Sequence, residues 1–181
     1  MKYNKKIKTD KNVEIIVRNA DYSDGEEVLR VFKETHAETD FLLSYTDENT
    51  LDVESEKRYL NRKSESLNEI ELLAIYDGKI VGFAGIDAVG SKYKVKHCAE
   101  FGICVLKKFW RLGIGNALTD ACIEIARDAG YAQIELNVVA DNYNAISLYR
   151  KKGFIEYGRN PKGFNSRNSG YQTLVYMLFE L

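Results

Sequence analysis

Hydrophobic and polar residues alternate with two different periods along this chain, and the order of those periods predicts its secondary structure. Apolar runs and period-two alternation, typical of strands, occur at 13–18, 71–76, 79–86, 97–106, 132–139, 154–157 and 171–180. Helical spacing follows Ser23-Asp24-Gly25-Glu26, which resembles a capping box, and recurs at 52–63, 113–128 and 142–152. The expected fold is α/β, in the order β-α-α-β-β-β-α-β-α-β-β.

Turn and cap residues set the boundaries of these elements. Asp77-Gly78 predicts a two-residue hairpin, because both positions accept positive φ. For the helix at 142–152, Asp141 is the expected N-cap and Gly153 the expected left-handed C-cap. The stretch 158–170 holds Pro161, the only proline, and is rich in Gly, Asn and Ser, so it is expected to be a loop.

Composition favours one globular domain at 13–181, preceded by a flexible basic tail at 1–12. Hydrophobic residues make up 45% of the 181 residues, charged residues 29%, and the net charge is −1. These values give no reason to expect binding to nucleic acid or membranes. The lysine-rich first residues have no apolar run, so they do not resemble a signal peptide, and no segment has the apolar length of a membrane span.

The three cysteines are scattered in apolar contexts. Cys98, Cys104 and Cys122 have no spacing typical of a metal site or of a disulfide framework. We expect reduced, structural thiols, no bound metal and a cytoplasmic protein.

Two glycines at the start of a helix are the most informative feature of the chain. Gly113 and Gly115 follow the strand at 97–106 and a basic turn that holds Lys107, Lys108 and Arg111. The first N–H groups of a helix have no intrahelical partner, so such a junction favours a phosphate site, although an ordinary helix start has the same letters. At the position of Leu118, a Rossmann fingerprint requires Gly or Ala, and a Walker loop requires Gly followed by Lys and Ser or Thr. The loop therefore matches neither motif.

A second segment makes the assignment specific. Residues 142–154 match the pattern Asn-x-x-Ala-x-x-x-Tyr-x-x-x-Gly-Phe at every position, and 110–115 match Arg/Gln-x-x-Gly-x-Gly/Ala except that Trp110 replaces Arg or Gln. Together these segments resemble the acetyl-CoA-binding signature of the GCN5-related N-acetyltransferases (GNAT superfamily). The resemblance implies the fold of that family, an α/β fold with a mixed sheet whose fourth and fifth strands splay apart. The pantetheine arm of the cofactor lies between those two strands.

The resemblance implies acetyl-CoA as co-substrate and a set of residues that bind it. That set is Ile103, Cys104, Val105, Trp110, Arg111, Leu112, Gly113, Ile114, Gly115, Asn116, Asn142 and Tyr149. Gly102 is expected to mark a bulge or a close backbone approach, leaving the backbone of 103–105 free to pair with pantetheine amides; relief of crowding would also explain it. Asn142 fits either a pantetheine contact or a helix cap.

The reaction that the resemblance implies needs a proton donor for the departing thiolate and a base for the amine. Tyr149 stands where the family's tyrosine meets the sulfur. Its spacing alone favours a core aromatic, but the flanking Asn142 and Gly153-Phe154 favour the role at the sulfur. Glu100 is the best candidate base, since it lies on the strand that pairs with pantetheine, but an exposed glutamate is commonly just solvated. His36 and His97, the only histidines, are weaker candidates and more simply structural.

The acceptor is expected to be a primary amine of a small molecule or of a protein (an α-amine or a lysine). Between Glu34 and Glu56 the chain has eight acidic residues and no lysine or arginine, which would attract a cationic amine or simply form a solvated surface. The competing function is a non-catalytic acetyl-CoA-binding sensor or interaction module. GNAT proteins are commonly dimers, so a homodimer is expected from the resemblance.

Overall fold

The computed structural model describes all residues 1–181 and contains one mixed sheet with four α-helices. The helices are α1 (Gly25–Glu38), α2 (Val53–Glu65), α3 (Ile114–Asp128) and α4 (Tyr143–Lys152), with short 3-10 turns η1 (Tyr22–Asp24), η2 (Thr46–Glu48) and η3 (Lys107–Phe109). The strands are β1 (Asn4–Lys8), β2 (Glu14–Asn19), β3 (Ile70–Tyr76), β4 (Lys79–Ala88), β5 (Cys98–Val105), β6 (Gln133–Val139), β7 (Ile155–Ser166) and β8 (Gly170–Glu180). From β2 onward the order is the predicted one, and the predicted fold class is confirmed.

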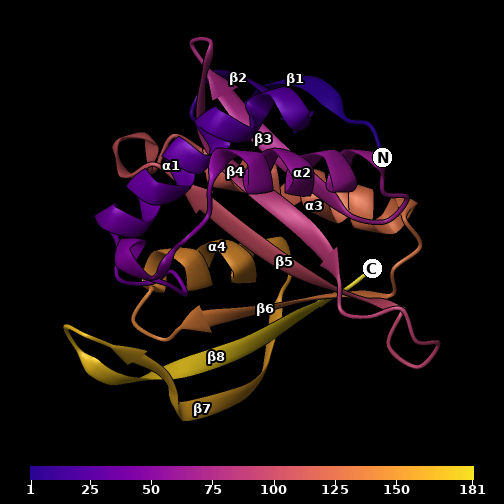
Figure 1. Cartoon of the computed structure of the whole chain (residues 1–181). Coiled ribbons are helices and arrows are strands. Elements are labelled where there is room, and N and C mark those ends of the chain that lie inside the picture. The colour runs from indigo at the N-terminus through magenta and orange to yellow at the C-terminus, as the bar shows by residue number, and fades with distance from the viewer.

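The sheet opens in its middle. Its strand order is β1-β2-β3-β4-β5-β6-β8-β7, and only the β5–β6 pair is parallel (Figure 1). β5 and β6 pair only where Cys98–Glu100 meets Gln133–Glu135, although β5 continues to Val105 and β6 to Val139. Beyond Glu100 the two strands therefore separate, as the resemblance implies for this fold.

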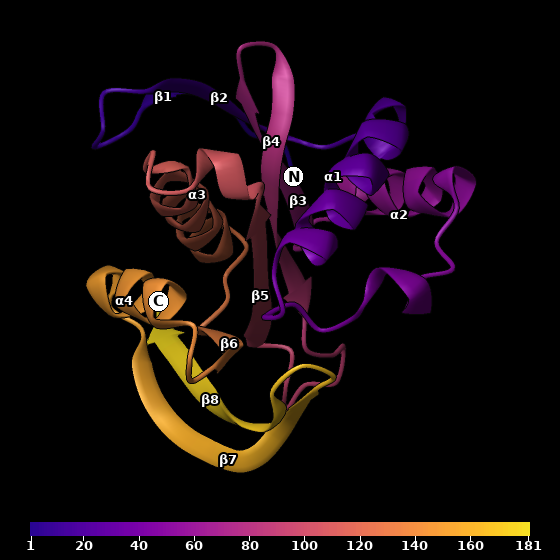
Figure 2. The same cartoon turned by 90° about the vertical axis from the view of Figure 1, so that its left-hand side faces the viewer.

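Helices cover both faces of the sheet. Figure 2 shows α1 and α2 on one face and α3 on the other. A cluster of 28 buried residues surrounds α3, and a smaller cluster of seven lies under α1 and α2. No helix of the structure is both long and apolar enough to cross a membrane.

The N-terminal segment is not the expected flexible tail. Residues 4–8 form β1, which pairs with β2 in register from Asn4↔Arg18 to Lys8↔Glu14. The prediction missed it because β1 is an edge strand whose lysines face solvent, so it lacks an apolar stripe. Charged residues on an edge strand also protect it from pairing with other chains.

Two expectations about helix starts are corrected. The N-cap of α4 is Asn142, which accepts a hydrogen bond from the Ala145 N–H at 3.3 Å, whereas Asp141 accepts one from Gln172. The capping box before α1 pairs Asp21 with Asp24 around η1, and α1 itself begins at Gly25.

The expected loop at 158–170 is mostly strand. β7 continues to Ser166, and its pairing with β8 shifts register twice, the second time between Asn160 and Phe164. Pro161 is tolerated there because β7 is the edge strand of the sheet and the ladder is interrupted at this point.

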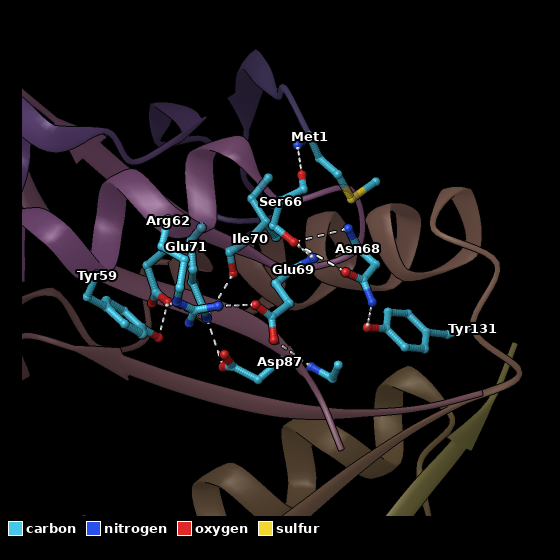
Figure 3. Close-up of polar contacts among 12 residues, drawn as sticks. Met1, Tyr59, Arg62, Ser66, Asn68, Glu69, Ile70, Glu71, Asp87 and Tyr131 are labelled. Carbon is cyan, nitrogen blue, oxygen red and sulfur yellow. Dashed lines mark hydrogen bonds and ion pairs between the residues drawn. The ribbon is translucent and has the colours of Figure 1, made fainter. Parts of the chain in front are cut away.

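A buried ion cluster joins α2 to the sheet. The Lys63 ammonium is 1% exposed and contacts Glu71 at 3.0 Å and Asp87 at 2.8 Å. The Tyr59 hydroxyl donates to Glu71 at 3.4 Å, and Figure 3 shows Tyr59, Glu71 and Asp87 close to one another. Burial alone would lower the pKa of Lys63, but the nearby carboxylates outweigh it and raise that pKa, so the side chain stays cationic. A Cβ at Gly85 would lie 2.6 Å from a Glu71 oxygen, so this cluster requires glycine below it.

We predict that Lys63→Met lowers the free energy of unfolding by about 3–5 kcal/mol, because it leaves Glu71 buried without its counter-charge. Lys57→Met, on the same helix but at an exposed pair with Glu54, should cost less than about 1 kcal/mol. Urea denaturation of both variants measures the difference. Equal losses would show that the buried cluster does not stabilise the fold.

Candidate active site

A cavity of about 380 Å³ lies where β5 and β6 separate, between α1, the η3–α3 loop and α4. Ten of the residues assigned by the resemblance line it. They are Ile103, Cys104, Val105, Trp110, Arg111, Gly113, Gly115, Asn116, Asn142 and Tyr149. The partial pairing of the two strands thus brings both sequence motifs to one site.

The glycine loop leaves backbone donors free at the start of α3. Gly113 is the N-cap, with a φ of 80°, and no side chain caps the helix. The first N–H groups of α3 therefore have no partner within the helix and form a site suited to an anion. Arg111 is exposed and forms no ion pair, so its charge is available beside this loop. Asn116 Oδ1 is buried without a hydrogen-bond partner, which leaves it free for a ligand.

Two assigned residues contribute differently from the rest. The Ile114 side chain is 1% exposed and belongs to the core around α3. The Leu112 carbonyl accepts a hydrogen bond from Thr9 at 2.8 Å. Neither residue lines the cavity, so only the backbone N–H groups of Leu112 and Ile114 are available to a ligand there.

The edge of β5 that faces the cavity has unpaired backbone groups. Alternate residues of β5 bond to β4, so Ile103 and Val105 direct their N–H and C=O groups to the other edge, where β6 has already diverged. Trp110 Nε1 donates to the Val105 carbonyl at 2.6 Å, which removes that acceptor from the free edge. The register of β5 with β4 is unbroken at Gly102, so the expected bulge is absent, and a Cβ there would meet only open space.

The Tyr149 side chain is both a core aromatic and a cavity residue. It lies edge-on to Phe101, with ring centroids 6.0 Å apart, and its ring is 5.8 Å from that of Phe154. No hydrogen bond is formed by its hydroxyl within the protein, and burial raises its pKa well above the usual value for tyrosine. The hydroxyl is therefore a protonated donor at neutral pH, without an internal acceptor. Asn142 caps α4, which confirms one of its two expected roles, and it also lines the cavity.

The other end of the cavity is built by residues that the sequence analysis did not single out. Thr35, Thr39, Phe41 and Leu42 line it from the end of α1 and the following loop. Their sequence has no motif, and only the fold brings them opposite β5. On α4, further lining residues are Asn144, Ser147, Leu148 and Lys151, which follow one another at spacings of three and four and so share one face of the helix.

The acidic stretch 34–56 is largely occupied by internal contacts. Asp40 accepts hydrogen bonds from Ser166 and from Tyr45, the latter at 2.8 Å. Arg167 binds Asp47 through two contacts of 2.8 Å and also reaches Glu48. These contacts tie the α1–α2 loop to the β7–β8 turn, which curves toward it in Figure 2. Three of the acidic residues, Asp40, Asp47 and Glu48, thus hold the loop in place.

The candidate bases lie away from the cavity lining. Glu100 is exposed on β5, on the same strand face as Cys104, and pairs in register with Asp87 and Glu135. His36 stacks on Phe32, and one ring nitrogen lies 2.7 Å from the Phe32 carbonyl. His97 is exposed just before β5. All three cysteines are free and buried, and Cys104 lines the cavity.

Comparison with known proteins agrees with this geometry. Residues 30–154 match the acetyltransferase (GNAT) family. The chain is 32% identical to the L-amino acid N-acetyltransferase AaaT of Escherichia coli (strain K12) over 167 residues, which is 91% of this chain and 96% of that protein.

Two solved structures share the fold. A GNAT-family acetyltransferase from Streptococcus pneumoniae superposes with a TM-score of 0.89 at 30% identity, over 93% of this chain and all (100%) of that one. A Salmonella typhimurium protein solved with its cofactor acetyl-CoA has a TM-score of 0.81 at 19% identity, over 92% and 94% of the two chains. The chain therefore belongs to the acetyltransferase (GNAT) family, whose members are N-acetyltransferases.

Proposed function

We propose that this protein transfers the acetyl group of acetyl-CoA to the primary amine of a small molecule. The observation that carries the proposal is the meeting, in one cavity, of the free β5 edge, the uncapped start of α3 and the Tyr149 hydroxyl. These features suit the amides, the diphosphate and the sulfur of acetyl-CoA, respectively. The Salmonella typhimurium relative of this fold is solved with that cofactor.

An amino acid is the acceptor class that we test first. The Escherichia coli relative that this chain matches over 96% of its length is named an L-amino acid N-acetyltransferase. At the acceptor end, Phe41 and Leu42 offer apolar surface, with the hydroxyls of Thr35 and Thr39 beside it. The closed contacts between the α1–α2 loop and the β7–β8 turn also favour a small acceptor over a protein chain.

In the proposed reaction, a neutral amine attacks the thioester carbonyl, the C–N bond forms, and the C–S bond breaks. Tyr149 donates its hydroxyl proton, as a hydrogen bond or by transfer, to the sulfur as negative charge develops there. Because the raised pKa of Tyr149 keeps it protonated, the donor is present throughout the neutral range. The amine proton passes to water; Glu100, the only acid on β5, lies outside the cavity lining and would receive that proton only through intervening water molecules.

The proposed cofactor site predicts the effect of a charge placed in the loop. In Gly115→Glu the new side chain meets Leu148 Cδ1 at 3.1 Å, a flexible end that can move, so the fold should persist. The new carboxylate would occupy the space that a phosphate of CoA needs. The loss of one charge-assisted contact costs about 1.5–3 kcal/mol of binding free energy. We expect CoA affinity to fall at least about tenfold by calorimetry. Ala132→Glu, which adds the same charge beyond the far end of α3, should bind normally; equal losses would refute the site.

The proposed proton donor predicts a separate kinetic effect. Tyr149→Phe keeps the ring packing on Phe101 but removes the hydroxyl. We expect kcat to fall by about 100-fold or more, while CoA affinity and the melting temperature hardly change. A substrate with a better thiol leaving group should recover part of the rate. If Tyr149→Phe turns over normally, the donor is water or another residue.

The function itself is tested by release of free thiol from acetyl-CoA across a panel of L-amino acids, other small amines and short peptides. Turnover with an amino acid is expected. Turnover with peptides alone would assign a protein acceptor. Tight CoA binding without any turnover would instead identify a non-catalytic acetyl-CoA sensor.

A further inference from the structure

The turn between β1 and β2 is fastened to the glycine loop of the proposed cofactor site. Thr9, 7% exposed, donates from Oγ1 to the Leu112 carbonyl at 2.8 Å. The same oxygen accepts from the Val13 N–H at 3.2 Å and the Lys11 N–H at 3.3 Å. One buried hydroxyl therefore fixes the turn and the loop relative to each other.

Asp10, at the tip of this turn, places a carboxylate against the loop. Gly113 has a φ of 80°, and a Cβ there would lie against Asp10 Oδ1 and 2.8 Å from Thr9 Cβ, so only glycine permits this approach. The other oxygen, Oδ2, lies 3.4 Å from Lys151 Nζ and 3.5 Å from Asn116 Nδ2. Lys151 and Asn116 both line the cavity.

In this arrangement the negative charge of Asp10 lies beside hydrogen-bond donors that would otherwise bind an anion. The N–H groups at the start of α3 and the Lys151 ammonium attract phosphate, whereas the Asp10 carboxylate repels it and occupies Lys151. A carboxylate is an unfavourable neighbour for a site whose only purpose is tight phosphate binding. Its contribution must be to the balance between binding and release.

We propose that Asp10 is a counter-charge that weakens the hold on the diphosphate of CoA: it competes for Lys151 and Asn116, and so speeds release of the product. Thr9 is the positioning residue that keeps Asp10 and the loop in contact. This inference rests on the proposed cofactor site, and it assigns a role to a segment outside both sequence motifs.

Calorimetric titration of Asp10→Asn with CoA tests the proposal. We expect binding about three- to tenfold tighter than in the wild type at low salt, with the difference shrinking at about 0.5 M NaCl because the repulsion is screened. In steady state, KM for acetyl-CoA should fall without a rise in kcat. Glu14→Gln removes an equal charge from an exposed position on the same hairpin and should leave CoA binding unchanged.

A purely structural role for Asp10 would give the opposite sign. If its contacts only hold the loop in shape, Asp10→Asn should weaken CoA binding; weaker or unaltered binding overturns the proposal. Lys151→Gln should weaken binding more in the Asp10→Asn background than in the wild type, because the lysine is then free for phosphate. Equal effects in both backgrounds would also overturn it.

Thr9 is tested by a matched pair of variants. Thr9→Val should tighten CoA binding, in the same direction as Asp10→Asn, because Asp10 is then no longer held against the loop, and Thr9→Ser, which keeps the hydroxyl, should bind CoA as the wild type does. If both variants bind alike, Thr9 does not position the loop. Failure of the wild type to bind CoA would refute the proposed function itself, and that result is distinct from any of these.

Discussion

The functional architecture depends on how little β5 and β6 pair. The two strands pair only where Cys98–Glu100 meets Gln133–Glu135, and beyond these residues they separate. If β5 and β6 paired along their whole length, the backbone N–H and C=O groups of Ile103 would bond to β6, and the cavity between α3 and α4 would be closed. Because the strands diverge, unpaired backbone groups remain at the centre of a rigid sheet. Each flanking element, from the glycine loop to Tyr149, takes its place around that opening.

Patterns of neighbouring residues in the sequence predicted most of this fold. Asp77-Gly78 forms the expected hairpin, with φ values of 50° and 72°, and Gly153 ends α4 in the left-handed region as expected. Both features depend on residues adjacent in sequence. The same is true of the two motifs, whose spacing reflects one helix start and one helix face. They supply six of the ten assigned residues that line the cavity, namely Trp110, Arg111, Gly113, Gly115, Asn142 and Tyr149.

What the sequence did not reveal depends on distant contacts. β1 has exposed lysines and no apolar stripe, so only its pairing with β2 identifies it as a strand. Phe41 and Leu42 reach the cavity because the α1–α2 loop is held by Ser166 and Arg167, more than a hundred residues away. Glu100 was chosen for its strand, yet the structure leaves it outside the cavity lining. Residue spacing cannot encode such arrangements, since they arise from packing of the whole chain.

The position of β8 has a consequence for how the chain folds. β8 follows β7 in sequence but lies between β6 and β7, so β7 has no sheet neighbour until β8 is in place. During synthesis, β6 therefore presents an open edge after α3 and α4 have already emerged from the ribosome. Open strand edges are the surfaces through which incomplete chains associate with one another. The nascent protein is thus most exposed to aggregation in the interval before residues 170–180 insert.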